Sequence, residues 1–210
     1  MAGTLIVFEG VEGSGKTTQL DQSYLWLQAK FCDRKIVKTR EPGDTELGLG
    51  LRQLLLQVKN TQPIYPTAEL LLYAADRAQH VQEVLLPSLA TDKIILCDRY
   101  TDSTIASQGY GRGLPRSIID GLNFFATNGL ESHLTIWLDV AVEVSLIRTR
   151  LRGKCDRIEQ ADLSFHQRVQ EGYNQLAQAF PHRIKRVDAS LDEQAVQEQI
   201  RAILQQHLSQ

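Results

Sequence analysis

The sequence predicts an α/β fold in which helices flank a five-stranded, mostly parallel sheet. Two observations lead to this prediction. Five short apolar or alternating segments alternate along the chain with longer segments whose apolar residues recur at helical spacing. A glycine-rich motif lies between the first apolar segment and the first helical one. Strands that alternate with helices pair in parallel through right-handed crossovers, so we expect a single domain over residues 1–210.

Composition narrows the class of protein. The chain has 210 residues, a net charge of -2 and three widely separated cysteines. Its length suffices for one core, and its charge gives no electrostatic argument for nucleic acid or an acidic membrane as a partner. No apolar run approaches the ~20 residues that span a bilayer. The odd cysteine count and the lack of a secretory signal favour reduced thiols, so we expect a cytoplasmic protein.

The expected strands are short segments bounded by turn residues. The first and third are almost continuously apolar, which predicts buried strands. Residues 41–44, Glu-Pro-Gly-Asp, form a turn signal directly after the second strand. The strands are expected at residues 4–9, 35–40, 93–97, 134–139 and 184–188.

The expected helices are recognised by apolar residues at helical spacing and by their boundaries. Pro87 is expected to end the long helix before it, and Gly109 and Gly111 to break the short polar one. Ser190 and Glu193 are expected to form a capping box for the last helix. The helices are expected at residues 19–30, 46–57, 67–86, 102–110, 116–126, 142–151 and 163–180, with a last one after the capping box.

The glycine-rich motif matches the phosphate-binding P-loop pattern G-x-x-x-x-G-K-[ST]. Its glycines let the backbone wrap a phosphate closely, and the N–H groups of the loop and of the following helix supply positive potential. Lys16 is expected to reach the β- and γ-phosphates of ATP, and Thr17 to ligate magnesium. The expected ATP-binding residues here are Gly10, Val11, Glu12, Gly13, Ser14, Gly15, Lys16, Thr17 and Thr18.

Asp98 follows the third expected strand directly. An acid in this position of a P-loop protein resembles the Walker B aspartate, which holds magnesium. The carboxyl ends of parallel strands are also where such sheets bind ligands. The alternative is that Asp98 only caps the next helix.

The densest basic cluster comprises Arg148, Arg150, Arg152, Lys154 and Arg157 around a glycine. A solvated basic face is the plain interpretation. Beside a P-loop, we prefer a lid over about residues 149–162 that closes arginines over a triphosphate.

These features indicate either phosphoryl transfer or a nucleotide-dependent switch. Arg40 and Arg99 lie at expected strand ends. They favour transfer, because a second anionic substrate that faces ATP needs cations to position it. The residues alone do not name the acceptor.

The assembled motifs resemble the thymidylate kinases of the bacterial type over nearly the whole chain. The motifs are Phe8–Thr18, Thr39–Gly43, Asp98–Tyr100, Tyr110–Gly113 and Asp156–Glu159. The resemblance implies a P-loop NTPase fold of the nucleoside monophosphate kinase type. It also implies transfer of the γ-phosphate of ATP to dTMP, with Mg²⁺, in dTTP biosynthesis. Members of the family are usually homodimers.

The resemblance also implies roles for individual residues. Tyr73 would stack on thymine, Arg77 would bond a thymine carbonyl, and Glu12 would contact the 3′-hydroxyl. From spacing alone, a packed aromatic beside a solvated arginine is the preferred interpretation of Tyr73 and Arg77, which share one helix face. The implied dTMP contacts are Glu12, Arg40, Arg52, Tyr73, Arg77, Arg99, Ser103, Thr104 and Gln108, and Arg148 is the implied adenine contact.

The catalytic arginine is expected in the lid. Some members of the family carry an arginine within the P-loop, where this chain has Gly13. The transition-state charge is therefore expected from Arg152, with Arg150 second. Lys16 and Arg99 complete the expected catalytic set.

Two residues depart from the usual pattern of the family. Asp44 replaces the second glycine of an Arg-Glu-Pro-Gly-Gly motif and brings a negative charge near the expected dTMP phosphate. Ser107 replaces a tyrosine that helps to exclude a ribose 2′-hydroxyl, which predicts weaker selection of deoxyribose. Ser107 also keeps open a kinase of UMP, CMP or dUMP. A P-loop switch that hydrolyses ATP slowly is the alternative from another class.

Overall fold

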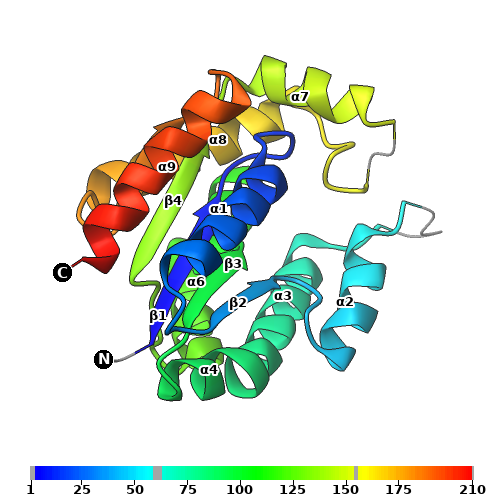
Figure 1. The fold of residues 1–210 in the computed structure, drawn as a ribbon. Helices are drawn as coiled ribbons and strands as arrows, with labels where there is room; N and C mark the ends of the chain where they lie inside the picture. The colour runs from blue at the N-terminus through cyan, green and yellow to red at the C-terminus, as the bar shows by residue number, and fades with distance from the viewer. Residues whose placement is uncertain (1–2, 59–62, 154–155, 210) are drawn as a thin grey trace.

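The computed structural model describes residues 3–58, 63–153 and 156–209. Within these ranges five strands form one sheet in the order β2-β3-β1-β4-β5, and every neighbouring pair is parallel (Figure 1). The predicted five-stranded α/β fold is confirmed. The strands are β1 (Thr4–Glu9), β2 (Ile36–Arg40), β3 (Ile94–Asp98), β4 (Leu134–Asp139) and β5 (Ile184–Asp188).

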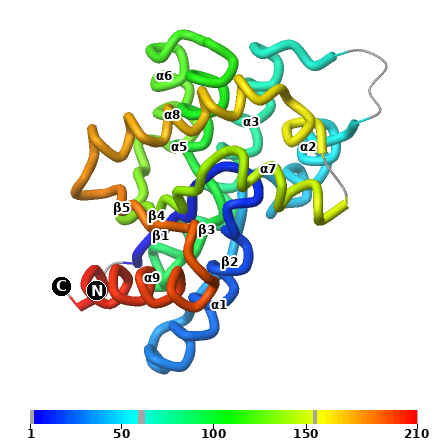
Figure 2. The backbone as a smooth tube through the Cα atoms, turned by 90° about the horizontal axis from the view of Figure 1, so that it is seen from above, coloured from blue at the N-terminus to red at the C-terminus, as the bar shows by residue number. Residues whose placement is uncertain are grey.

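Helices cover both faces of this sheet. In Figure 2, α1 and α9 lie on one side of the strands, and α6 and α8 lie on the other. The helices are α1 (Lys16–Lys30), α2 (Glu46–Leu56), α3 (Pro66–His80), α4 (Leu86–Ala90), α5 (Thr101–Thr104), α6 (Arg116–Thr127), α7 (Val142–Leu151), α8 (Leu163–Ala179) and α9 (Glu193–Leu208).

Strand β1 divides its side chains between two buried clusters, because successive residues of a strand point to opposite faces. Ile6 and Phe8 belong to the larger cluster, which includes residues of α1 and α9. Leu5 and Val7 belong to a second cluster that lies against the helical segment after α3. Neither pair is exposed to solvent, so β1 is held rigidly where it enters the P-loop.

Pro87 does not end the helix expected at 67–86. The chain continues from α3 through a π-helical segment, Val81–Leu85, into α4, which contains Pro87 in its first turn. Proline is tolerated in a first turn, because the backbone N–H that it lacks has no partner there. The wider π turn before it allows the chain to stay helical.

The segment expected as a helix at 102–110 also changes from an α-helix to the wider π-helix. It begins as α5 and continues as a second π-helical segment, Ile105–Gly111. Gly109 therefore lies inside the helical segment, which ends at Gly111, within the glycine-containing run that was expected to break it. The space at Gly111 is occupied, since an added Cβ would lie 2.6 Å from the Cε2 atom of Phe165 in α8.

The expected capping box before the last helix is wrong. Asp192 is the N-cap of α9, and its side chain accepts a hydrogen bond from the backbone N–H of Ala195. Ser190 instead donates its hydroxyl to Asp188. An aspartate side chain caps as well as serine, and it stands one residue before the helix begins.

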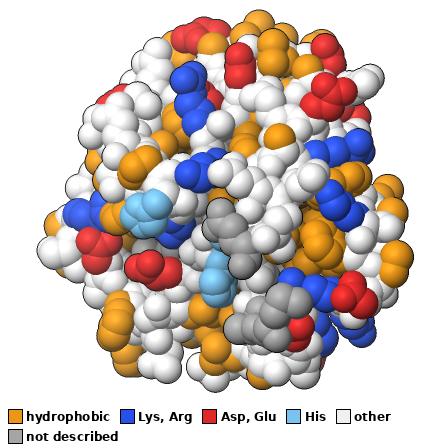
Figure 3. Space-filling view, turned by 60° about the vertical axis from the view of Figure 1, so that its left-hand side comes forward, with side chains coloured by type: hydrophobic (Ala, Val, Ile, Leu, Met, Phe, Trp, Pro, Cys, Tyr) orange, Lys and Arg blue, Asp and Glu red, His pale blue; other side chains and the backbone are white. Residues whose placement is uncertain are grey.

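The surface carries charges of both signs. On the face shown in Figure 3, basic and acidic side chains are interspersed, as the small net charge leads one to expect. Across the described ranges, no helix has the length and apolar character needed to cross a membrane.

Candidate active site

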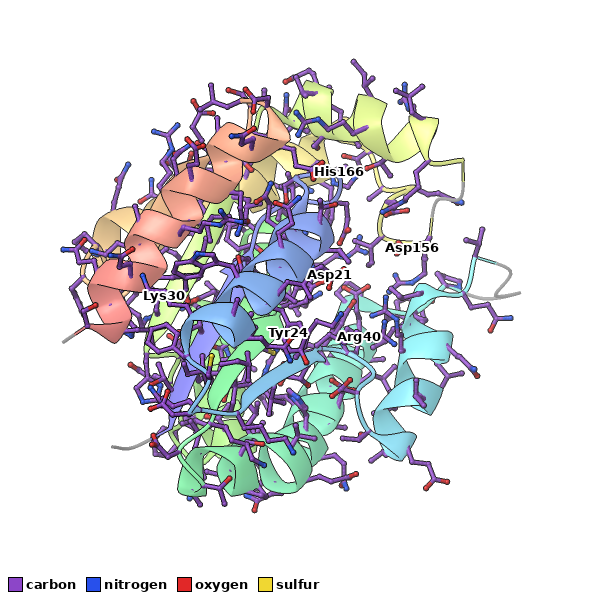
Figure 4. All side chains as sticks on the ribbon, viewed as in Figure 1. Asp21, Tyr24, Lys30, Arg40, Asp156 and His166 are labelled. Carbon is purple, nitrogen blue, oxygen red and sulfur yellow. The ribbon has the colours of Figure 1, made fainter. Side chains whose placement is uncertain are left out.

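A cleft of about 980 Å³ opens at the carboxyl ends of the strands. Register places these ends together, since both Phe8 of β1 and Arg40 of β2 pair with Asp98 of β3. Figure 4 shows Asp21, Arg40, Asp156 and His166 on this side of the molecule, and all four line the cleft. Its volume is near the upper end of ligand pockets, roughly 300–1,000 Å³.

The P-loop forms the floor of the cleft. Gly10, Gly13 and Gly15 all have positive φ, at 143°, 74° and 92°, which other residues adopt only with strain. Lys16 donates to the backbone carbonyls of Gly10 and Val11 at 3.0 and 2.9 Å. Burial, and then the nearby guanidinium of Arg99, lower the pKa of Lys16. The loop thus holds a buried amine at the position where a phosphate would bind.

Helix α7 packs directly on this loop. An added Cβ at Gly13 would lie 2.3 Å from the carbonyl oxygen of Ser145 and 2.7 Å from Oγ1 of Thr149. A side chain at position 13 is therefore incompatible with this position of α7.

Asp98 lies at the end of β3 beside the P-loop. Its Oδ1 atom is buried and has no hydrogen-bond partner. The alternative that it caps the next helix is wrong, because Tyr100 is the N-cap of α5 and no side chain caps that helix. Thr17 lines the same cleft. One carboxylate oxygen and one hydroxyl, completed by phosphates and water, suit Mg²⁺. In the described ranges no cluster of three or more His, Cys, Asp or Glu side chains forms a metal site of its own.

Arg99 and Glu12 form an ion pair across the cleft floor. Burial acts to raise the pKa of Glu12, but Arg99 and then Lys16 outweigh it and lower the value to about 2. Arg99 itself has a positive φ of 72°, an uncommon conformation that often marks functional sites. It also donates to the carbonyl of Gly10 and the hydroxyl of Ser103, both at 3.1 Å.

Glu9 supports this arrangement from beneath. It is fully buried and accepts hydrogen bonds from the backbone N–H of Tyr100 at 2.9 Å and of Ser103 at 3.1 Å. Its other oxygen accepts from the hydroxyls of Ser103 at 2.6 Å and Tyr173 at 2.8 Å. Burial raises the pKa of Glu9 although Arg99 lies nearby.

Arg77 is buried and does not face solvent, so a solvated arginine is the wrong interpretation. It donates to Glu41 at 2.8 Å, Thr104 at 2.9 Å, Asn123 at 2.8 Å and the carbonyl of Tyr100 at 3.0 Å. Arg77 nevertheless lines the cleft. Its orientation is fixed by protein atoms before any ligand enters.

The amide of Gln108 is also held in place. Its Nε2 donates to Glu69 at 2.9 Å, and Glu69 in turn accepts from Arg112 and Arg157. The carbonyl oxygen of Gln108 remains available as an acceptor. Tyr73 and Ser107 line the cleft with it.

Two arginines lie on the side of the cleft formed by the segment after β2. Arg52 donates to the carbonyl of Pro42 at 2.9 Å, and Arg40 donates to the carbonyl of Gly43 at 3.4 Å. Burial, and then the charge of Arg40, lower the pKa of Arg52. The structure thus holds two like charges close together at the cleft.

The lid arginines differ in position. Arg148 and Arg152 line the cleft, whereas Arg150 does not. Arg148 donates to the carbonyl of Ala189 at 3.1 Å, and Arg152 pairs with Glu159. Lys154, which belongs to the expected basic cluster, lies outside the described residues, and the expected lid is described at 149–153 and 156–162.

The remaining expected site residues gather in the same cleft, apart from Ser14. The cleft lining includes Gly10, Val11, Glu12, Gly13, Gly15, Lys16, Thr17, Thr18, Ser103 and Thr104. Ser14 is buried, and its hydroxyl has no partner.

Sequence reasoning missed several buried polar residues around the cleft, namely Glu9, Glu41, His80, His166 and Tyr173. Glu9 is the last residue of an apolar strand, as Asp98 is the last residue of β3, so the same signal identifies it. The other four lie in a turn or on helices, and no local pattern separates them from surface or core residues.

Comparisons with known proteins agree on one family. A family model described as thymidylate kinase matches residues 8–200. A thymidylate kinase of Nostoc punctiforme is 59% identical, over 99% of this chain and 98% of the relative. A thymidylate kinase of Gloeobacter violaceus is 50% identical, over 98% of this chain and 96% of the relative. A crystal structure of thymidylate kinase from Ehrlichia chaffeensis superposes with a TM-score of 0.80 at 33% identity, covering 98% of this chain and 100% of that chain.

Proposed function

The chain belongs to the thymidylate kinase family and phosphorylates dTMP, and we propose that its cleft holds ATP and dTMP with their phosphates end to end. The observation that supports this placement is that Tyr73, Arg52 and Arg99 line one cleft together with Lys16. Transfer breaks the bond between the β,γ-bridging oxygen and the γ-phosphorus of ATP and forms a bond to a dTMP phosphate oxygen. Positioning and charge stabilisation supply most of the catalysis in such transfers.

The donor nucleotide occupies the P-loop half of the cleft. The backbone N–H groups of the loop and Lys16 bind the β- and γ-phosphates, and Arg148 packs on adenine. Thr17 and Asp98 would hold Mg²⁺, which would supply positive charge to offset the negative charge of the phosphates. Arg152 supplies a further positive charge from the lid.

The acceptor occupies the half between α3 and the segment after β2. Arg40, Arg52 and Arg99 surround the dTMP phosphate, and Tyr73 stacks on thymine. The fixed guanidinium of Arg77 meets a thymine carbonyl, and the free oxygen of Gln108 accepts the N3–H. Because the structure already holds these groups in place, little side-chain entropy is lost when dTMP binds.

A coupled assay of ADP formation tests the acceptor. ATP and Mg²⁺ are supplied with dTMP, dUMP, UMP or CMP in turn. We expect the highest kcat/KM with dTMP. A higher value with dUMP, UMP or CMP would establish another pyrimidine specificity. Ser107, which lines the cleft, is the residue that keeps this alternative open. ADP formation independent of any monophosphate would instead indicate a P-loop ATPase switch.

We further propose a homodimer joined through α2, α3 and α6. These helices expose large apolar side chains, which monomeric proteins seldom group together. The residues are Leu47, Leu54, Leu71, Phe124 and Phe125, each at least 52% exposed. Light scattering of the wild type and of Phe125→Glu tests this assembly, and a wild-type monomer at micromolar concentration would refute it.

A single domain over residues 1–210, with a lid at about 149–162, and a cytoplasmic location also remain proposals. Within the described part of the chain, Cys32 and Cys97 carry free thiols, which suit a reducing compartment. Cell fractionation tests the location. Limited proteolysis tests the domain, since one cooperative unit leaves a single resistant core.

A further inference from the structure

A buried glutamate lies behind the acceptor side of the cleft, and no step of the proposed transfer uses it. Glu69 of α3 is 0% exposed. Its Oε1 accepts hydrogen bonds from Nε2 of Gln108 at 2.9 Å and from Nε of Arg112 at 3.1 Å. Its Oε2 accepts from Arg112 at 3.2 Å and from Arg157 at 2.6 Å. One carboxylate thus joins α3, the π-helical segment that contains Gln108, and the lid.

Arg157 comes from the expected lid, yet it is fastened to the acceptor side. It is not among the residues that line the cleft. Besides its bond to Glu69, its Nε donates to the backbone carbonyl of Leu55 at 2.8 Å, and its backbone N–H donates to that of Leu56 at 3.3 Å. Arg157 is therefore held against α2 and α3, where its charge faces Glu69.

The two guanidiniums keep Glu69 ionised. Burial acts to raise the pKa of Glu69, but the hydrogen bonds from Arg112, Gln108 and Arg157 and the charge of Arg112 outweigh it and lower the pKa. An ionised carboxylate has only acceptor atoms. The group of Gln108 that faces Glu69 must therefore be the NH₂ group, which donates.

This contact also fixes the other end of the Gln108 amide. The oxygen and nitrogen of an amide diverge from one carbon, so Oε1 of Gln108 is turned away from Glu69. Gln108 lines the cleft, and its Oε1 accepts no hydrogen bond from the residues that the structure describes. The cleft is thus offered an acceptor at this position.

We infer that Glu69 is a positioning residue that acts through Gln108 to make the cleft select pyrimidines with a proton on N3. The inference rests on the proposed placement of thymine beside Gln108. Thymine and uracil carry a donor at N3, whereas N3 of cytosine is an acceptor. A fixed Oε1 bonds the first two bases and meets the lone pair of the third, and a site built for one hydrogen bond rejects an analogue that cannot make it.

Without Glu69 the amide would not select. A free glutamine can turn over and offer its NH₂ group to cytosine N3, because it carries both donors and an acceptor. Beside Glu69, turning over would place Oε1 against a carboxylate oxygen and leave buried polar groups unpaired, which is costly. Arg112 is itself held by the ring of Phe165, whose centroid lies 4.5 Å from its guanidinium carbon. Selection therefore depends on groups that the base does not touch.

Competition kinetics with the full-length protein test this inference. The values of kcat/KM for dTMP, dUMP and dCMP are compared in the wild type and in Glu69→Gln, where the new amide can donate as well as accept. We expect the dTMP-to-dCMP ratio to fall about tenfold, as for one hydrogen bond exchanged for an unpaired group. The dTMP-to-dUMP ratio should stay constant, since both bases carry N3–H. Glu198→Gln, an exposed acid of α9, is the matched control.

Two outcomes overturn the inference. One is an unchanged dTMP-to-dCMP ratio in Glu69→Gln. The other is an equal loss of kcat/KM for all three nucleotides, which marks a merely structural residue. These ratios do not depend on the fraction of protein that is folded. If Glu69→Gln yields no folded protein, Glu69→Gln with Arg112→Gln replaces it, because this pair of changes keeps the net charge of the cluster, and the same fall is expected.

Gln108→Leu separates this inference from the placement of thymine. In Gln108→Leu the dTMP-to-dCMP ratio should fall, and adding Glu69→Gln should lower it no further, because Glu69 acts only through the amide. A second fall of similar size would refute the inference. An unchanged ratio in Gln108→Leu alone would refute the placement of thymine, whereas a fall there beside an unchanged ratio in Glu69→Gln refutes only the role of Glu69.

Discussion

Gly13 lies so close to α7 that an added Cβ would come within 2.3 Å of the carbonyl oxygen of Ser145. The P-loop therefore cannot hold a side chain at this position while α7 stays in place. The same helix brings Arg148 to the cleft, and Arg152 follows directly after its end. The packing of α7 on Gly13 thus excludes an arginine at this position of the P-loop, and the same helix places Arg148 and Arg152 at the cleft.

Replacing Arg152 by alanine should lower kcat by ~10³-fold, the range found for other arginine fingers, and leave KM for dTMP nearly unchanged. Arg152 lines the cleft and is expected to act on the γ-phosphate in the transition state. Initial rates with saturating ATP measure the effect. Arg201→Ala, on the exposed side of α9, is the control. A turnover number close to that of the wild type would remove Arg152 from the mechanism.

Enlarging Ser107 to tyrosine should sharpen the selection of deoxyribose. Ser107 lines the cleft and is half-buried, and a larger side chain there would crowd a 2′-hydroxyl. The ratio of kcat/KM for dTMP over ribo-TMP should rise by about tenfold or more, a typical result of differential contact in a pocket. Ser164→Tyr, on exposed α8 surface, serves as the control. A wild-type ratio that matches stringent relatives, or no change in the variant, contradicts the prediction.

Replacing Asp98 by asparagine should weaken Mg²⁺ binding. Its buried Oδ1 has no hydrogen-bond partner, so this oxygen is available to ligate a cation. The Mg²⁺ concentration for half-maximal turnover should rise by about tenfold or more, as for other groups that orient a bound metal. Removing Mg²⁺ with EDTA should stop turnover in the wild type without preventing dTMP binding. Asp120→Asn is the exposed control, and an unaltered Mg²⁺ titration in Asp98→Asn would exclude the role.

Asp76 should make stability fall as pH rises. Burial, and then the charge of Glu41, raise its pKa from 3.8 to about 6 in the folded protein. Because the folded state holds this proton more tightly, the stabilisation is complete below pH 3.8 and is lost as pH rises through about 6. The pKa difference corresponds to about 3 kcal/mol.

Urea unfolding of the wild type and Asp76→Asn between about pH 4 and pH 7 measures this contribution. Asparagine keeps an acceptor for the backbone N–H of Gly43, which Asp76 binds at 3.0 Å. The wild-type free energy of unfolding should fall relative to the variant across this interval. A constant difference between the two proteins would show that Asp76 does not titrate there.

The sequence by itself determined the layered fold and the donor half of the site. Strand and helix periods are local properties of the chain, and the P-loop places its chemistry within eight consecutive residues from Gly10 to Thr17. Asp98 was recognisable for the same reason, because a single strand end carries it. The motif resemblance extended this to the residues of the acceptor pocket, which spacing alone left ambiguous.

Only the tertiary structure decided which polar groups are already engaged. Arg77 binds four partners from distant segments, His80 connects Thr39 to Glu41, and Arg150 does not line the cleft that Arg152 lines. Such contacts depend on how α3, α7 and the segment after β2 pack against the rest of the protein. No local sequence pattern predicts that packing. A hydrogen bond requires its two atoms within about 3 Å of each other, and packing of the whole chain sets that distance.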